Sequence, residues 1–208
     1  MWALNYDADN ATHIKETLEL TSFILGSEIA NYMLLDRLKI LSSKDMLTGV
    51  LNRNEMNNLV DELSRDDDSN QSIGVAFTDL NGLKSINDTE GHPAGDLMLK
   101  NAANALREVF DVDTIFRAGG DEFSILIKGI TPDEMAKKIS QVREVSEKYD
   151  KVSFAIGFHV EENCKNVRTA LRLADENMYK DKAEYYKKFP EKKRVVRDLI
   201  NIKSASDD

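Results

Sequence analysis

Two groups of acidic residues are the clearest candidates for chemistry in this chain. Asp79 ends a short apolar run, and Asp121 and Glu122 directly follow the glycine pair Gly119-Gly120. If the segments that carry them are neighbouring strands, the carboxylates meet at one sheet edge, and paired carboxylates are suited to holding Mg2+. Acidic residues are also common in turns, so either group alone would indicate little. The glycines strengthen the case because they allow a polyphosphate to approach the backbone.

The elements that would position these acids are short apolar runs with the composition of strands. Residues 73–78 are apolar at both odd and even positions, which favours a central strand covered on both faces. The runs 114–118 and 122–128 are separated by the glycine pair, and a two-residue glycine link indicates a hairpin. A fourth run follows at 152–159. If the hairpin lies beside the first strand, both acidic groups share one edge of the sheet.

Helical patterns alternate with these strands. Thr131 to Glu134 form a capping box with Pro132 in the first turn, which opens a helix that buries side chains as far as Val145. The other predicted helices cover residues 14–43, 53–64, 91–110 and 165–187. The order β-α-β-β-α-β-α after the leading helices predicts an α+β fold of the ferredoxin-like or polymerase-palm type, with an antiparallel central sheet flanked by helices.

The composition excludes several classes of protein. Of the 208 residues, 41% are hydrophobic and 31% are charged, which excludes a disordered or low-complexity chain. The 37 acidic residues outnumber the 28 basic ones, so we expect no general attraction to duplex nucleic acid or anionic lipid. A polyanionic ligand would need a metal or a local basic cluster. The single Cys164 excludes internal disulfides and multi-cysteine zinc sites.

The N-terminal helix at 14–43 has an imperfect coiled-coil pattern. Ser27 and Asn31 interrupt its apolar seam, so two interpretations stay open: an intermolecular stalk and a helix that packs on its own domain. Charged residues interrupt the apolar stretch 18–41 and no leader pattern precedes it, so we expect no membrane span and a cytoplasmic location. The apolar seam positions are Leu20, Ile24, Leu34, Leu38 and Leu41.

Residues 117–123, Arg-Ala-Gly-Gly-Asp-Glu-Phe, resemble the signature of the GGDEF family of diguanylate cyclases. Other segments resemble the family's motifs in the expected order, from about residue 45 to 182. They are 45–53, 79–84 with Asn87-Asp88, Gly91-His92, Gly95-Asp96, 155–157, 174–175, Met178-Tyr179 and Lys182. The resemblance implies a nucleotidyl cyclase-like domain at 45–188, preceded by a helical segment or dimerisation stalk at 1–44 and followed by a basic-then-polar tail at 189–208.

The resemblance also implies a reaction. Two GTP molecules would condense to cyclic di-GMP with release of two pyrophosphates, in a homodimer whose subunits each present one GTP. Mg2+, or Mn2+ in its place, would be held by Asp79, the backbone carbonyl of Leu80 and Asp121. By the same resemblance, Asp121 would help to deprotonate the ribose 3′-hydroxyl, with Glu122 assisting. An in-line attack on the α-phosphorus needs such a metal, because the metal activates the hydroxyl and neutralises phosphate charge.

Substrate contacts follow from the same resemblance. Asn87 and Asp96 would read the guanine, with His92 nearby. A carboxylate accepts hydrogen bonds from both N1–H and the exocyclic amine of guanine, which favours GTP over ATP. Lys84 and Lys182 would reach the phosphates as mobile point charges. The remaining substrate-binding residues implied by the resemblance are Gly82, Leu83, Gly119 and Gly120.

The sequence departs from the family pattern at three places. In one of them, Asn81 to Leu83, the hydrophobic residues usual in the family are partly replaced, and Gly82 gives the phosphate loop backbone freedom. Many members carry an inhibitory product site, an Arg-x-x-Asp motif five residues before the double glycine. Here Phe110 replaces the arginine while Asp113 is retained, so this site is degenerate and we expect weak or absent product inhibition through it. The family also tends to place an arginine four residues after the lysine that matches Lys182. Tyr186 stands there instead, so triphosphate binding is expected to be weaker unless Lys187 or Lys188 compensates.

Two alternatives to a cyclase stay open at this point. One is a non-catalytic module that binds GTP or a cyclic dinucleotide, and the other is a different nucleotidyl cyclase or palm enzyme on the same fold. Five intact residues favour the cyclase: Asp79, Asn87, Asp96, Asp121 and Glu122. No sensory domain is recognisable in the N-terminal segment, so an upstream sensory domain of a longer protein and input through the helix are both open.

Overall fold

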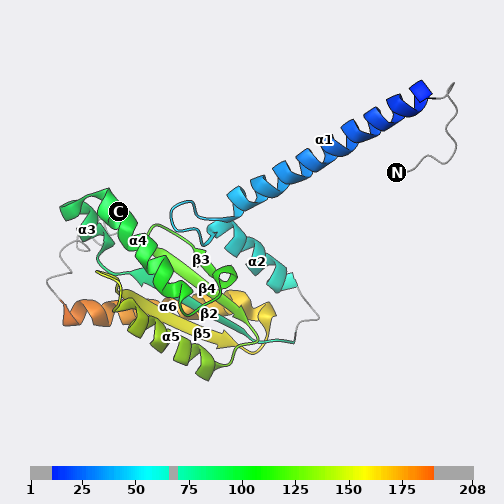
Figure 1. The fold of residues 1–208 in the computed structure, drawn as a ribbon. Helices are drawn as coiled ribbons and strands as arrows, with labels where there is room; N and C mark the ends of the chain where they lie inside the picture. The colour runs from blue at the N-terminus through cyan, green and yellow to red at the C-terminus, as the bar shows by residue number, and fades with distance from the viewer. Residues whose placement is uncertain (1–10, 66–69, 190–208) are drawn as a thin grey trace, which may run out of the picture. The chain divides into compact units, whose positions relative to one another are not determined.

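The structure, a computed structural model, describes residues 11–65 and 70–189 and divides the chain into two units (Figure 1). The first unit spans Met1–Ser43 and the second Lys44–Asp208. In the first unit the described residues form one helix, α1 (Ala11–Ser43), as the sequence predicts for 14–43. Of the tail predicted at 189–208, all residues after Phe189 lie outside the described part of the chain.

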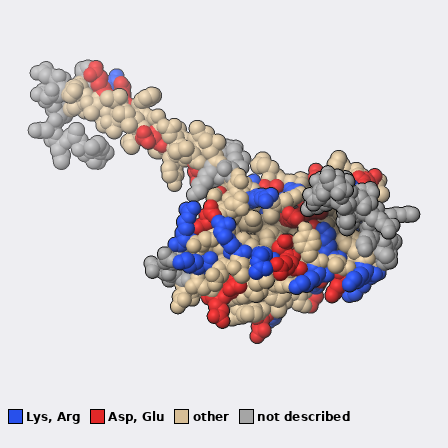
Figure 2. All heavy atoms as spheres, turned by 180° about the vertical axis from the view of Figure 1, so that it is seen from behind, with Lys and Arg blue, Asp and Glu red and all other residues tan. Residues whose placement is uncertain are grey.

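The surface of α1 is rich in apolar side chains. Leu20, Ile24, Leu34 and Leu38 each expose more than half of their surface, and the side chain of Leu41 lies outside the described residues. Figure 2 shows the described part of α1 as largely uncharged. Within the described residues, no helix is long and apolar enough to cross a membrane. The described side chains of the apolar seam of α1 are therefore not covered within their own unit.

The second unit contains a five-stranded sheet in the order β1-β3-β4-β2-β5. The central strand β2 (Ile73–Leu80) pairs antiparallel with β4 (Glu122–Lys128) and with β5 (Phe154–Glu161). The short strand β3 (Ile115–Arg117) pairs antiparallel with β4. A two-residue edge strand, β1 (Leu51–Asn52), runs parallel to β3, so the sheet is mixed at this edge. The predicted antiparallel core of the sheet is confirmed.

Helices cover both faces of the sheet (Figure 1). One core packs the sheet against α4 (His92–Arg107) and α5 (Pro132–Ser146), and the other packs it against α2 (Arg53–Arg65) and α6 (Val167–Lys188). Alternate side chains of β2 enter the two cores, which explains why its sequence is apolar on both parities. Helix α5 begins with the predicted capping box. The predicted α+β sandwich is confirmed.

Three features differ from the sequence expectation. The helix predicted at 91–110 ends at Arg107, although Phe110 beyond it is buried. Neither β1 nor α3 (Leu83–Glu90) was predicted. Two residues are too few to show a strand period, and α3 is a short helix with several weak helix formers in its sequence. Both elements therefore depend on contacts that the local sequence does not encode.

Candidate active site

The acidic residues predicted from separate segments meet at one edge of the sheet, where the central strand β2 ends and its neighbour β4 begins. Asp79, next to the last residue of β2, is buried, and its register partner on β4 is Glu122. The Leu80 N–H donates a hydrogen bond to the carbonyl oxygen of Asp121 over 3.0 Å. Because β2 and β4 are neighbouring strands, the structure brings these four residues together.

Lys182 brings a positive charge to this edge from α6. Its Nζ donates to Oδ2 of Asp79 over 2.6 Å, and the Asp79 side chain is only 7% exposed. Helix α6 lies directly against β5 at Gly157, where an added Cβ would collide with the helix backbone at residues 174, 177 and 178. The missing side chain of Gly157 thus allows α6 to come close enough for Lys182 to reach Asp79.

Burial and repulsion set the charge states of the site. Burial raises the pKa of Asp79 above its ordinary value and the charge of Asp121 adds to this, while Lys182 opposes it. Burial also raises the pKa of Glu122, with further contributions from Asp121 and Asp79. Burial alone would lower the pKa of Lys182, but the Asp79 carboxylate reverses this and raises it. Three carboxyl groups and one ammonium group therefore share this edge of the sheet.

The donor atoms at this edge fit a hard divalent cation. Asp79, Asp121 and the carbonyl of Leu80 are oxygen donors, and Mg2+ commonly uses one or two protein carboxylates with water and substrate phosphates as its other ligands. Among the described residues, no three His, Cys, Asp or Glu side chains are grouped as a ready-made metal centre. A cation at this edge would complete its coordination with water or with a phosphorylated substrate.

The turn between β3 and β4 is braced from outside. Its link is four residues, 118–121, and neither glycine has a positive φ, so the two-residue glycine turn expected from the sequence is wrong. Arg117 donates to the carbonyl of Gly120 over 2.7 Å and forms an ion pair with Asp45 at 3.0 Å. A Cβ on Gly119 would lie 2.8 Å from the carboxylate of Glu122. Sequence reasoning missed Arg117 and Asp45 as a brace, although both lie in the quoted motifs.

The residues expected to read guanine come from two helices joined by a tight turn. Gly82, with φ +85°, precedes α3, and Asn87 of α3 lies against Gly95 of α4, where an added Cβ would be 2.9 Å from the amide carbon of Asn87. Asp96, next to Gly95, is exposed. The contact thus brings Asn87 and Asp96 to the same region. Lys84 and His92 are also exposed, whereas the side chain of Leu83 packs in the core, so only the backbone of Leu83 is available to a substrate.

Asn81 is a buried polar residue beside the acidic edge, and the sequence analysis assigned it no role. Its backbone N–H donates to the Ser153 carbonyl over 2.8 Å, and its Nδ2 lies 3.3 Å from Ser153 Oγ. Its Oδ1 has no hydrogen-bond partner among the described residues. These contacts tie the segment that follows β2 to the loop before β5. The position directly after Leu80 was the available signal.

Of the two motif positions expected to correspond to a product site, one is buried in the core and the other is exposed. Phe110 is 4% exposed, and the ammonium group of Lys138 lies 5.4 Å from the centre of its ring. Lys138 also donates to the carbonyl of Val109 over 3.0 Å. Asp113 is exposed in the short turn at 112–114. The position at which family members carry an arginine therefore holds an apolar side chain that packs inward.

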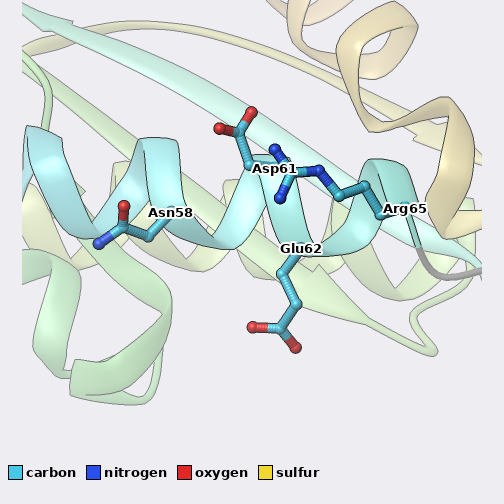
Figure 3. A pocket seen from close by; sticks show the side chains of 4 residues that line it. All are labelled: Asn58, Asp61, Glu62 and Arg65. Atoms are coloured by element: carbon cyan, nitrogen blue, oxygen red, sulfur yellow. The ribbon is translucent and has the colours of Figure 1, made fainter.

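A shallow hollow of about 550 Å³ lies elsewhere, on the exposed face of α2. Figure 3 shows its four lining side chains projecting from this one helix. One of them, Asp61, is held by an ion pair with Arg168 at 2.6 Å. None of the four is a predicted site residue, and the hollow has no convergent polar groups of the kind that fix a ligand. Its lining residues are Asn58, Asp61, Glu62 and Arg65.

Comparison with known proteins assigns the family. Residues 42–188 match the family described as "Diguanylate cyclase, GGDEF domain". The chain is 30% identical over 207 residues to "Probable diguanylate cyclase DgcT" of Escherichia coli, covering 91% of this chain and 44% of that protein. It is 29% identical over 185 residues to an uncharacterized membrane protein of Staphylococcus saprophyticus, covering 82% of this chain and 52% of that protein. The chain thus spans about half the length of these curated relatives.

Solved structures share the fold. The coiled coil and GGDEF domain of DgcB from Caulobacter crescentus, solved in complex with c-di-GMP, has a TM-score of 0.68 at 21% identity and covers 81% of this chain and 95% of its own. The GGDEF domain of FimX from Pseudomonas aeruginosa has a TM-score of 0.57 at 26% identity, covering 67% of this chain and 95% of its own. The sheet and its flanking helices are therefore those of a known domain type.

Proposed function

The chain belongs to the GGDEF domain family, and on that premise we propose that it is a diguanylate cyclase, which condenses two GTP molecules into cyclic di-GMP and two pyrophosphates. The observation that carries the proposal is the meeting of Asp79, Asp121 and Glu122 at one sheet edge, with Lys182 reaching it from α6. In the proposed assignment, residues 45–188 carry the activity.

The acidic edge would supply the metal site and the base. Asp79, the Leu80 carbonyl and Asp121 would hold Mg2+ or Mn2+, which when bound makes the ribose 3′-hydroxyl more acidic and neutralises phosphate charge. Asp121 would accept the proton of this hydroxyl. The raised pKa of Glu122 brings this carboxylate closer to the pH at which a general base works best, so it suits an assisting role.

The α3–α4 pair would bind the nucleotide. The Asn87 amide and the Asp96 carboxylate together would hydrogen-bond the guanine edge, with His92 close by, and Asp96 would repel the N1 lone pair of adenine. The φ of Gly82 turns the chain between the metal edge and α3, so that its backbone and that of Leu83 would face the phosphates, as would the backbone of the Gly119-Gly120 turn. Lys84 and Lys182 would balance the phosphate charge, and the neutral Tyr186 would add none.

Two half-sites must meet for two GTP molecules to react, so the proposal requires a homodimer. The exposed apolar seam of α1 supports the stalk interpretation of residues 1–44, because burying it between two copies would remove apolar surface from water. Joining the half-sites through a stalk would raise the effective concentration of one GTP at the other. A cytoplasmic location belongs to the same proposal because GTP is the substrate.

The test is incubation of the protein with GTP and Mg2+ at several protein concentrations, with products separated by chromatography. We expect cyclic di-GMP to form at a rate that rises more steeply than linearly with protein concentration. Asp121→Asn should abolish it, while Glu144→Gln, which removes an exposed charge from α5, should not. Calorimetric GTP binding without product at any concentration would instead favour the non-catalytic module, and a linear or mixed dinucleotide would favour another nucleotidyl transferase.

A further inference from the structure

The ion pair between Lys182 and Asp79 occupies an oxygen that a divalent cation would need. Lys182 Nζ lies 2.6 Å from Asp79 Oδ2, and Asp79 is buried, so the ammonium group already fills the cation position at this carboxylate. We propose that Lys182 is a displaceable counter-ion, which stabilises Asp79 in the metal-free protein and moves to the substrate phosphates when a divalent cation binds. This inference rests on the proposed metal site.

Charge balance explains why Asp79 needs a positively charged partner in the metal-free protein. Asp79, Asp121 and Glu122 lie together at the sheet edge, and a buried carboxylate without a partner destabilises the fold strongly. Lys182 provides that partner before metal and nucleotide arrive. Once a divalent cation contacts Asp79, the ammonium group and the cation repel each other at close range, whereas a triphosphate offers new negative charge nearby.

The geometry confines the movement to the side chain of Lys182. Two residues of α6 are tied to β5: Asp181 accepts from the Ile156 N–H over 2.8 Å, and Asn177 donates to the Phe158 carbonyl over 3.2 Å. The helix backbone is therefore held in place. The Lys182 side chain is 26% exposed, so its flexible stem has an open side along which the ammonium group can swing.

The proposal predicts opposite effects of Lys182 on the two ligands. Without nucleotide, Lys182 competes with the cation for Asp79, so removing its charge should strengthen metal binding. With nucleotide, Lys182 holds a phosphate, so the same change should weaken GTP binding. A lysine that stays on Asp79 when nucleotide binds would give only the first result. Its removal would strengthen metal binding, but GTP titrated by calorimetry would bind the variant as tightly as the wild type.

The experiment is a titration of Mn2+ alone, without nucleotide, monitored by the electron paramagnetic resonance signal of free Mn2+. The proteins are the wild type, Lys182→Met and the matched control Lys180→Met, whose Nζ contacts Asn177 rather than Asp79. Removing one positive charge this close to a carboxylate changes the affinity of that carboxylate for a cation by about tenfold or more. We expect Lys182→Met to bind Mn2+ about tenfold more tightly than the wild type, and Lys180→Met to bind as the wild type does.

Circular dichroism of each variant shows whether it is folded. If Lys182→Met does not fold, Lys182→Gln keeps a hydrogen-bond donor for Asp79 without the charge and should show the same gain. Equal or weaker Mn2+ binding by the folded variant overturns the proposal, and so does the absence of binding by every protein, since Lys182 would then not be what excludes the cation. Turnover plays no part in the titration, so failure of the cyclase assay would be a separate result.

Discussion

Gly157 is the position where a single methyl group should separate the helix that carries Lys182 from the sheet that carries Asp79. A Cβ built there lies 2.5 Å from the carbonyl carbon of Asn177 and still closer to the backbone of Met178 and Ala174. Ordinary carbon contacts are about 3.5 Å or longer, so α6 must move by about 1 Å or more, and backbone atoms cannot rotate away as a side chain can.

The magnitude follows from this overlap. Overpacking of this kind destabilises a protein by about 1–3 kcal/mol, which for a domain of this size lowers Tm by about 2–4 °C per kcal/mol. We therefore expect Gly157→Ala to melt about 2–12 °C below the wild type. Because Lys182 follows one turn after Met178, its Nζ should move away from Asp79 Oδ2. A displacement of about 1 Å near a reacting centre can reduce turnover about 100-fold.

Thermal denaturation followed by circular dichroism, with cyclase activity measured on the same samples, tests this. Gly74→Ala is the matched control, because its Cβ would meet the side chain of Ile130, which can repack, and it should lose less stability. Gly26→Ala should have no steric cost, since nothing lies within 4 Å of its Cβ. If Gly157→Ala melts within about a degree of the wild type and keeps its activity, then α6 does not depend on this glycine and the reasoning is refuted.

Four further predictions concern the site and its surroundings. Glu122→Gln should raise the Tm of the metal-free protein at pH 8 but not below about pH 4. Because the pKa of Glu122 is raised in the folded state, the folded protein binds more protons than the unfolded chain at pH values just above the unfolded pKa of 4.5. Wild-type stability therefore falls as the pH rises from the unfolded pKa through the folded one, and glutamine, which does not ionise, avoids this loss. Arg117→Met should cost about 1–3 kcal/mol in urea denaturation because it leaves Asp45 unpaired in a half-buried site, whereas Arg168→Met, which breaks an exposed pair, should cost under about 1 kcal/mol; equal losses would contradict the brace. Cyclic di-GMP titrated without GTP should not bind tightly at the product site, because Phe110 is buried where an arginine would be needed. Tight binding that is lost in Asp113→Ala would contradict this. Tyr186→Arg should lower the KM for GTP by adding positive charge one turn beyond Lys182, and an unchanged KM would show that position 186 does not face the phosphates.

Much of the architecture could be predicted because its signals are local. The two-sided apolar run of β2, the capping box of α5 and the glycine-linked hairpin each follow from residues within one turn or one strand. The edge strand β1 and the short helix α3 could not be predicted, since neither is long enough to show a period. The length of the β3–β4 link was predicted incorrectly, because β3 ends at Arg117 and β4 begins at Glu122, so Ala118 and Asp121 lie in the link together with the two glycines.

The sequence by itself determined which chemical groups are available: the acids that end one strand and begin another, the glycines between them and the family motifs that surround them. Only the tertiary structure decided that Asp79 and Glu122 are register partners and that Lys182 reaches Asp79 from 103 positions away. The physical reason is that side-chain periodicity reports on neighbours within a few residues. Strand register and the approach of a helix to Gly157 are instead set by backbone pairing and packing across the whole domain.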